Sequence, residues 1–142
     1  MAFERVYTVW DYYDGPRSGI DAYSGESHHY ECEWDETKNN YAETFVLTPI
    51  DKETLSLAME QWLIECEWRA AFRRGSVPQS THPALPGKHP RYAELEMTLK
   101  ARISALPVSH KRASAVFRAQ AGQATELEVE WTDTESESRE AR

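Results

Sequence analysis

Cysteine, basic residues and long apolar runs are all scarce in this chain of 142 residues. The only two cysteines, Cys32 and Cys66, form no C-x-x-C pattern, so a disulfide or zinc framework is not indicated and we expect reduced thiols. No apolar stretch approaches the roughly 18 residues that a membrane-spanning helix needs, and the first residues do not resemble a signal peptide. We therefore expect a cytoplasmic protein with no membrane contact.

The charge balance also limits the kinds of partner that we expect. Sixteen Lys and Arg face 24 Asp and Glu, a formal net charge of -8, which opposes nucleic-acid binding and favours a basic partner. The signatures G-x-S-x-G, P-loop, G-x-G-x-x-G and H-E-x-x-H are absent, and we expect no cofactor. His28 and Cys32 share a predicted strand face but lie roughly 13 Å apart, too far to bind one ion. We predict no metal site.

Aromatic side chains gather instead between Val6 and Asp35. This stretch holds two of the five tryptophans and five of the seven tyrosines. Aromatic and β-branched residues punctuated by Gly and Pro favour antiparallel strands, here joined by a turn at Asp14-Gly15-Pro16. The pattern predicts strands over residues 6–13, 17–23 and 27–34.

The rest of the chain alternates strand and helix signals. Residues 41–47 and 127–131 predict two more strands. Thr48 as cap and Pro49 in the first turn predict a helix that runs to about Arg74, with Leu55, Met59, Trp62, Cys66 and Ala70 along one face. Residues 76–91 are a proline-rich loop, and a second helix follows from residue 90 or 91 to 106.

Two segments near the end are less regular. Residues 109–121 are rich in alanine and favour a short helix, although 114–118 could pair as a strand. Residues 132–142 contain no apolar residue larger than alanine, so we expect a disordered tail.

These elements predict an α+β fold in one domain over residues 1–131. We expect a curved antiparallel sheet of about five strands packed against two main helices. An SH3-like, partly open barrel is one specific form of this arrangement.

One enzymatic hypothesis arises from the first hairpin. Asp11, Asp14, Arg17, His28 and His29 could converge and supply carboxylates, a guanidinium and imidazoles for acid–base chemistry. However, Asp-Gly-Pro is a strong turn signal by itself, and turn chemistry with an ion pair explains the same residues.

The aromatic surplus favours binding over catalysis. One sheet face cannot bury all these rings, so either both faces are covered or one is exposed as a platform for a protein partner. We predict a small acidic interaction module, such as an inhibitor, immunity-type protein or adaptor, which binds a basic protein or forms a homodimer. The candidate binding residues are Trp10, Tyr12, Asp14, Arg17, Tyr23, His28 and Trp34.

The alternative function is a small enzyme or ligand-binding domain. Its pocket for a small molecule would be lined by Trp10, Tyr12, Asp14, Arg17 and His28.

Overall fold

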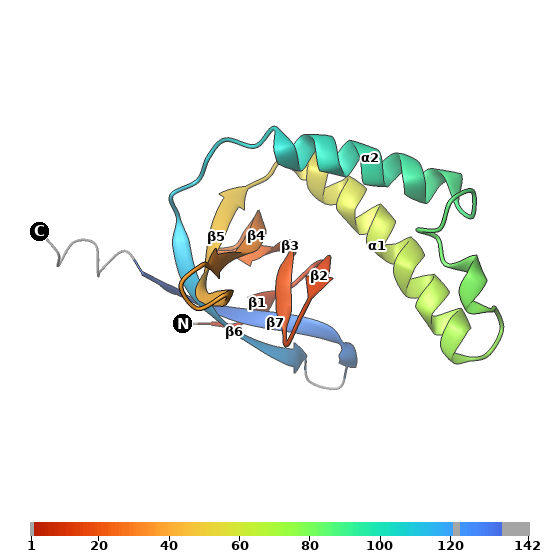
Figure 1. Cartoon of the computed structure of the whole chain (residues 1–142), viewed down its shortest axis with the longest axis horizontal. Helices are drawn as coiled ribbons and strands as arrows, with labels where there is room; N and C mark the ends of the chain where they lie inside the picture. Colours follow the sequence, from red (N-terminus) through yellow and green to blue (C-terminus); the bar gives the residue numbers. More distant parts are fainter. Residues whose placement is uncertain (1, 121–122, 135–142) are drawn as a thin grey trace, which may run out of the picture. The chain divides into compact units, whose positions relative to one another are not determined.

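The computed structural model describes residues 2–120 and 123–134 (Figure 1). Its elements are β1 Glu4–Arg5, β2 Asp11–Tyr12, β3 Pro16–Tyr23, β4 Glu26–Asp35, β5 Asn40–Pro49, α1 Lys52–Arg73, the short 3-10 helix η1 Gln79–Thr81, α2 Pro90–Ser104, β6 Arg112–Gln120 and β7 Gln123–Asp133. The expected α+β class is confirmed. Within the described residues, no helix is both long and apolar enough to cross a membrane.

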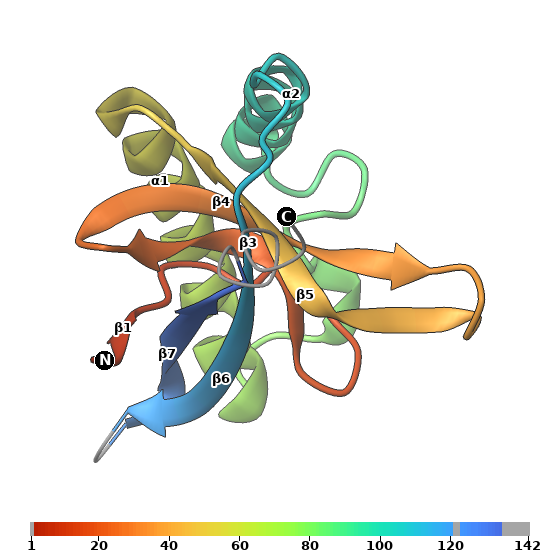
Figure 2. The same ribbon diagram turned by 90° about the vertical axis from the view of Figure 1, so that its left-hand side faces the viewer.

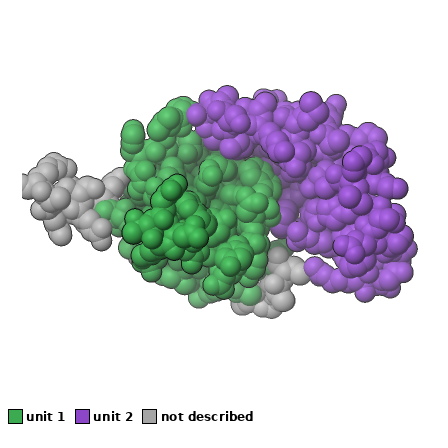
Figure 3. Space-filling model, in the orientation of Figure 1, with its two compact units in different colours: residues 1–51, 107–142 green, residues 52–106 purple. Residues whose placement is uncertain are grey.

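The chain forms two compact units, coloured separately in Figure 3. Residues 1–51 and 107–142 make the sheet unit, and residues 52–106 make the helical unit. One domain over residues 1–131, and helices packed on the sheet, stay predictions. The expected tail lies mostly outside the described residues, although β7 extends to Asp133.

All strands of the sheet unit belong to one antiparallel sheet, in the order β1-β7-β6-β5-β4-β3-β2 (Figure 2). The sheet is curled, and the N-terminal segment contacts both of its ends. Glu4 pairs with Val129 of β7, whereas Val6 forms a bridge to Asp21 of β3. The sheet therefore has seven strands and not about five. Of the predicted first strand, residues 6–13, only Asp11–Tyr12 forms a strand, β2, and β1 at Glu4–Arg5 precedes it as an additional strand.

The other additional strand is β6, where the predicted helix over residues 109–121 is wrong. Ala113 is buried and Ala115 and Phe117 are partly buried against the core, so the apolar positions alternate as in a strand. Pairing with β7 runs from Ala113 to Gln120. Alanine has the highest helix propensity, but such propensities are small per residue, and this long pairing outweighs them.

Tyr30 lies at the centre of the core of the sheet unit. It is fully buried, and its ring centroid lies 6.1 Å from Phe45, 6.0 Å from Phe117 and 6.4 Å from Trp131. Its hydroxyl donates to the carbonyl of Thr8 at 2.9 Å. A Cβ at Gly19 would lie 2.2 Å from the same carbonyl oxygen, so only glycine lets the N-terminal segment pack this closely against β3.

The helical unit is a hairpin of α1 and α2. The helix α1 begins at Lys52, because Thr48 and Pro49 belong to β5 and pair with His29 and His28; the predicted cap at Thr48 is therefore wrong. The helix α2 starts at Pro90 as predicted and is capped by His89, whose Nδ1 accepts from the Tyr92 amide at 3.0 Å.

The buried residues of α1 are Thr54, Ala58, Gln61 and Glu65, not the predicted apolar line. Three of them contact α2. Gln61 Nε2 donates to Glu96 at 3.3 Å, and Glu65 accepts from the Tyr92 hydroxyl at 3.3 Å. Arg102 donates to Thr54 at 3.3 Å. Polar contacts therefore join the two helices, in addition to the buried apolar residues Ala58, Leu95 and Leu99.

Candidate functional site

The strands β5 and β6 are paired over only a short length. Their register covers three pairs, Thr44–Ser114, Phe45–Ala113 and Val46–Arg112. From Thr44 back to Asn40, β5 follows β4 toward the turn that joins them. From Ser114 to Gln120, β6 remains paired with β7, so the two hairpins separate (Figure 2). The sheet is therefore open between these strands.

A cavity of about 480 Å³ lies at this opening. We call it the β5–β6 notch, and its apex is the Thr44–Ser114 pair. Its lining comes from the turn before β3, from β5 and from β6: Asp14, Gly15, Pro16, Arg17, Tyr41, Ala42, Glu43, Phe45, Ser114, Ala115 and Phe117. This volume lies in the range of ordinary ligand sites.

Backbone polar groups of β6 face the notch. The Lys111 carbonyl accepts from Leu47 of β5, whereas the next carbonyl, that of Arg112, accepts from Thr134 at the end of β7. Successive residues of a strand direct their N–H and C=O groups to opposite sides, so Phe117 and Ala119 direct theirs toward β5. Among the described residues, no strand pair reaches them from that side. They form a free strand edge, and Phe117 also lines the notch.

Arg17 is held in the wall of the notch by several contacts. Its Nε donates to the Tyr13 carbonyl at 2.7 Å and its Nη2 to the Asp14 carbonyl at 3.2 Å. Its Nη1 lies 3.5 Å from Cys32 Sγ, and its guanidinium stacks 4.5 Å from the centroid of the Tyr41 ring. The turn that supplies both carbonyls is possible because Asp14 and Gly15 adopt positive φ values of 54° and 117°. The guanidinium is thus pre-oriented by backbone groups.

Aromatic rings surround this guanidinium. Trp34 packs edge-on against Tyr41 at 5.3 Å, and Tyr13 lies 6.1 Å from the same ring. Trp34 is 51% exposed and Tyr13 is 64% exposed. Burial raises the pKa of the Cys32 thiol, although Arg17 acts in the opposite direction, so Cys32 is a neutral neighbour of the cation.

The predicted site residues are divided among three places. Asp14 and Arg17 line the notch and Trp34 packs against its wall. Trp10 contacts His29 at 5.9 Å, on the face of β4 opposite to His28. Tyr12 is 70% exposed and lies outside the lining.

Tyr23 and His28 form the third place. Their rings meet edge to face at 5.2 Å, and the Tyr23 hydroxyl donates to Asp133 at 2.6 Å. Lys111 also donates to Asp133, at 2.9 Å, and these two bonds hold the pKa of Asp133 below its usual value. Burial first, and then the bond to Asp133, raise the pKa of Tyr23. This cluster links the β3–β4 hairpin to the end of β7.

The hypothesised acid–base residues make separate contacts. Asp11 accepts from the Ser18 hydroxyl at 2.8 Å, and His28 Nδ1 donates to the Glu26 carbonyl at 2.9 Å. Burial lowers the pKa of His29 to about 4. A histidine buried in its neutral form beside Trp10 fits a structural role. Within the described residues, no group of three or more His, Cys, Asp and Glu side chains is placed to bind a metal.

Asp21 is a second unusual group of the sheet. It is fully buried, and its Oδ2 accepts from Trp131 Nε1 at 2.8 Å, whereas Oδ1 has no hydrogen-bond partner among the described residues. Burial raises its pKa well above the usual range. The lining of the notch does not include it. Asp21 therefore has a structural role, as the acceptor for the buried Trp131 indole.

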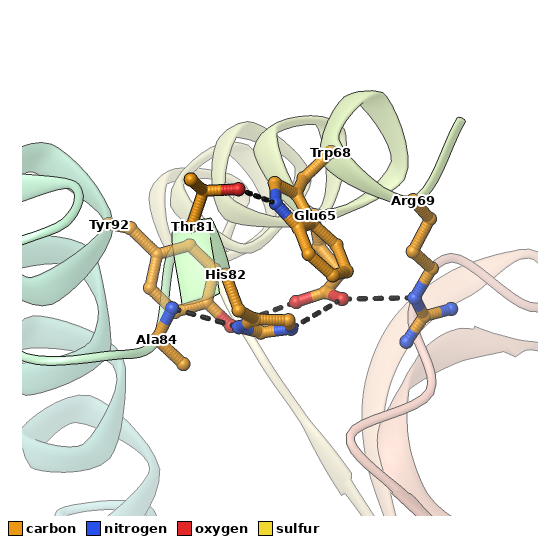
Figure 4. A network of polar contacts seen from close by, with 7 residues as sticks. All are labelled: Glu65, Trp68, Arg69, Thr81, His82, Ala84 and Tyr92. Atoms are coloured by element: carbon orange, nitrogen blue, oxygen red, sulfur yellow. Dashed lines mark hydrogen bonds and ion pairs between the residues drawn. The ribbon is translucent and has the colours of Figure 1, made fainter. Parts of the chain in front are cut away.

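The helical unit contains a polar network around Glu65 (Figure 4). Glu65 Oε2 accepts from Arg69 Nε at 2.9 Å and lies 3.2 Å from His82 Nε2. Because His82 Nδ1 accepts from the Ala84 amide at 3.0 Å, the ring proton is on Nε2 and points at Glu65. Both ring nitrogens of His82 are occupied, which leaves none to take a proton from a substrate.

Several notch residues were not predicted. Phe117 lies in the segment that resembled a helix, and Tyr41 and Phe45 belong to a predicted strand that had no assigned role. The alternation of Ala113, Ala115 and Phe117 is the sequence signal that could have indicated β6.

The chain matches none of the protein-family models, curated proteins or solved structures with which it was compared. The function is therefore inferred from the residues and geometry of the notch.

Proposed function

We propose that this protein is an interaction module that binds an extended segment of a partner protein in the β5–β6 notch. The segment adds as a strand to the free edge of β6, so that the curled sheet acts as a partly open, SH3-like barrel. The observation that carries the proposal is the free backbone edge at Phe117 and Ala119 beside a cavity. Strand addition to an exposed edge is a common mode of peptide recognition.

The notch supplies more than backbone groups. Phe45 and Phe117 give apolar walls, and the exposed rings of Tyr13 and Trp34 lie close to the lining residue Tyr41. Tyrosine, tryptophan and arginine are the side chains that most often anchor protein interfaces. Side chains of the bound strand would alternate between these walls and solvent.

The charges favour a partner with basic residues. Asp14 and Glu43 line the notch, and the whole chain carries a formal net charge of -8. Lys or Arg near the bound segment would be attracted to this surface and could stack on the exposed rings. Such binding should weaken as the salt concentration rises.

The experiment uses the full chain as bait for phage libraries of roughly ten-residue random peptides with free ends. An enriched synthetic peptide is then added to the ¹⁵N-labelled protein, and amide hydrogen exchange is measured. We expect slower exchange at Phe117 and Ala119, whose N–H groups face the notch. Val116 and Arg118 are built-in controls, because their amides already face β7.

A variant tests the same edge. Ala119→Pro removes one notch-facing N–H without removing a bond to β7, so we expect weaker peptide binding, whereas Ala119→Thr keeps the N–H and should bind normally. If no peptide is enriched, or if a bound peptide protects neither Phe117 nor Ala119, strand addition is wrong.

A small anionic ligand is the second candidate. The cavity of about 480 Å³ with the Arg17 guanidinium and three aromatic lining residues favours it. A thermal-shift screen against carboxylates and phosphates tests this function, and a hit should be lost in Arg17→Met. A ligand at about one hundred times its Kd adds roughly 2.7 kcal/mol of stability.

A further inference from the structure

We infer that the segment bound in the β5–β6 notch is the carboxy-terminal end of the partner chain, with its terminal carboxylate on Arg17. This inference rests on the proposed function and adds the part of the partner that is recognised. It follows from three features of the notch: where it closes, the direction that a strand must take in it, and the positions of its charges.

The notch is closed at its apex. Thr44, Phe45 and Val46 of β5 already pair with β6 on the side that a guest strand would use. A strand bound along Phe117 and Ala119 therefore cannot continue past Ser114. It must end there or turn away from the sheet.

The direction of the guest strand follows from the sheet. Every pair of neighbouring strands in it is antiparallel, and a guest that continues this pattern lies antiparallel to β6. The strand β6 runs from the apex outward, so such a guest runs inward, as β5 does. Its carboxy-terminal end then lies at the apex.

Arg17 is the one basic side chain among the described residues that line the notch. Its Nη1 contacts Cys32, which pairs with Phe45 next to the apex, and its guanidinium stacks on Tyr41, farther from the apex along β5. A terminal carboxylate that ends at the apex can pair with Arg17, and it must point away from the lining carboxylates of Asp14 and Glu43.

Arg17 retains donors for such a carboxylate. A guanidinium has five N–H groups, and three of them are directed at Tyr13, Asp14 and Cys32. One N–H remains on each terminal nitrogen, and two donors in one plane match the two oxygens of a carboxylate. The Tyr41 ring and the backbone carbonyls hold the group in place, so little side-chain freedom is lost on binding.

The test compares two forms of one enriched peptide, with a free carboxylate and with a carboxamide, by fluorescence anisotropy against the full chain. We expect the carboxamide to bind roughly 10- to 100-fold more weakly, as for loss of a charge-assisted hydrogen-bond pair. A third form, extended by Gly-Ser-Gly at its carboxyl end, should also bind weakly because it cannot pass the apex.

The variants separate Arg17 from its surroundings. Arg17→Met should remove the preference for the carboxylate, whereas Arg17→Lys should keep part of it. Arg5→Met is the matched control, since Arg5 also stacks on a tyrosine, Tyr7, but lies outside the notch lining, and this variant should keep the preference for the carboxylate. A ¹⁵N spectrum of each variant checks that the turn and the sheet are intact.

Failure of this inference is distinct from failure of the proposed function. Equal affinity of the carboxylate, carboxamide and extended forms, with Phe117 still protected, would overturn carboxylate recognition and leave strand addition standing. A preference for the carboxylate that persists in Arg17→Met would also overturn it. Absence of any peptide binding in the notch would remove both proposals.

Discussion

The two units of this protein differ in the side chains at the centre of their cores. The sheet unit encloses a cluster of rings around Tyr30, whereas the helical unit packs Leu95 and Leu99 of α2 with a stripe of α1 that includes the polar Gln61 and Glu65. Apolar burial is non-directional and stabilises in proportion to area, but buried polar groups stabilise only when each one keeps its partners. We therefore expect the sheet to tolerate imperfect geometry and the hairpin to depend on a few specific contacts.

The largest effect should come from removal of a core ring. Phe45→Ala leaves a cavity beside Tyr30 and Trp131 and should lower the free energy of unfolding by roughly 3–5 kcal/mol. Urea denaturation measures this loss, and exchange of the β4 amides locates it. Val116→Ala, at a 57% exposed position of β6, is the control and should change stability by less than about 0.5 kcal/mol. A comparable loss in the two variants would contradict the core assigned here.

Acid should weaken the sheet unit through His29. Burial lowers the pKa of this histidine to about 4, from 6.5, so its uncharged form is favoured in the folded state. As the pH falls below about 6.5 the unfolded chain takes up a proton first, and stability decreases until about pH 4, by up to roughly 3 kcal/mol. Urea midpoints between pH 7.5 and pH 4 measure this, and His29→Gln should show a shallower decrease. An unchanged slope would show that His29 is hydrated.

The hairpin should respond to a smaller chemical change. Glu65→Gln keeps the shape of the side chain but removes the charge that Arg69 and His82 contact. Loss of these charge-assisted bonds should cost about 1–3 kcal/mol, seen as faster exchange of the α1 amides. Glu65→Leu is the second variant to measure, because an apolar side chain leaves the Tyr92 hydroxyl and His82 without the hydrogen-bond acceptor that Glu65 provides. If Glu65→Leu were as stable as the unmodified protein, the network would not hold the hairpin.

The smallest effect should come from a polar contact at the surface. Tyr23→Phe removes the hydrogen bond to Asp133 while the ring stays against His28. Because this bond is partly exposed to water, we expect a loss of about 0.5–1.5 kcal/mol by thermal denaturation. A loss larger than that of Glu65→Gln would reverse the comparison between the two units.

The sequence predicted elements where local signals and packing agree. The strands β3, β4 and β5 follow alternating side chains, and Asp14-Gly15 marks the turn that positions Arg17. The strand β6 was mistaken for a helix because alanine has the highest intrinsic helix propensity, whereas its pairing with β7 depends on contacts that the local sequence does not show. The orientation of α1 was missed because apolar periodicity cannot reveal a buried stripe whose members, Gln61 and Glu65, are polar.

The residues of the notch, too, could be predicted from the sequence only in part. Arg17 and Asp14 could be selected from their turn, and Trp34 from the aromatic surplus. Their neighbours Tyr41 and Phe117 could not, because three strand pairs between β5 and β6 decide where the sheet opens. Such a short register depends on contacts between segments that are about 70 residues apart, as Thr44 and Ser114 are.

The pairing of the N-terminal segment with β7 has a consequence for how the protein is made. Glu4 and Val129 come together only after the ribosome has synthesised nearly the whole described chain, whereas α1 and α2 contact each other within residues 52–106. Contacts distant in sequence form slowly, and local helical contacts form quickly. During synthesis, the helical hairpin can fold before β7 is made. Until then the sheet is incomplete, and the aromatic side chains of β3 and β4 remain exposed to solvent.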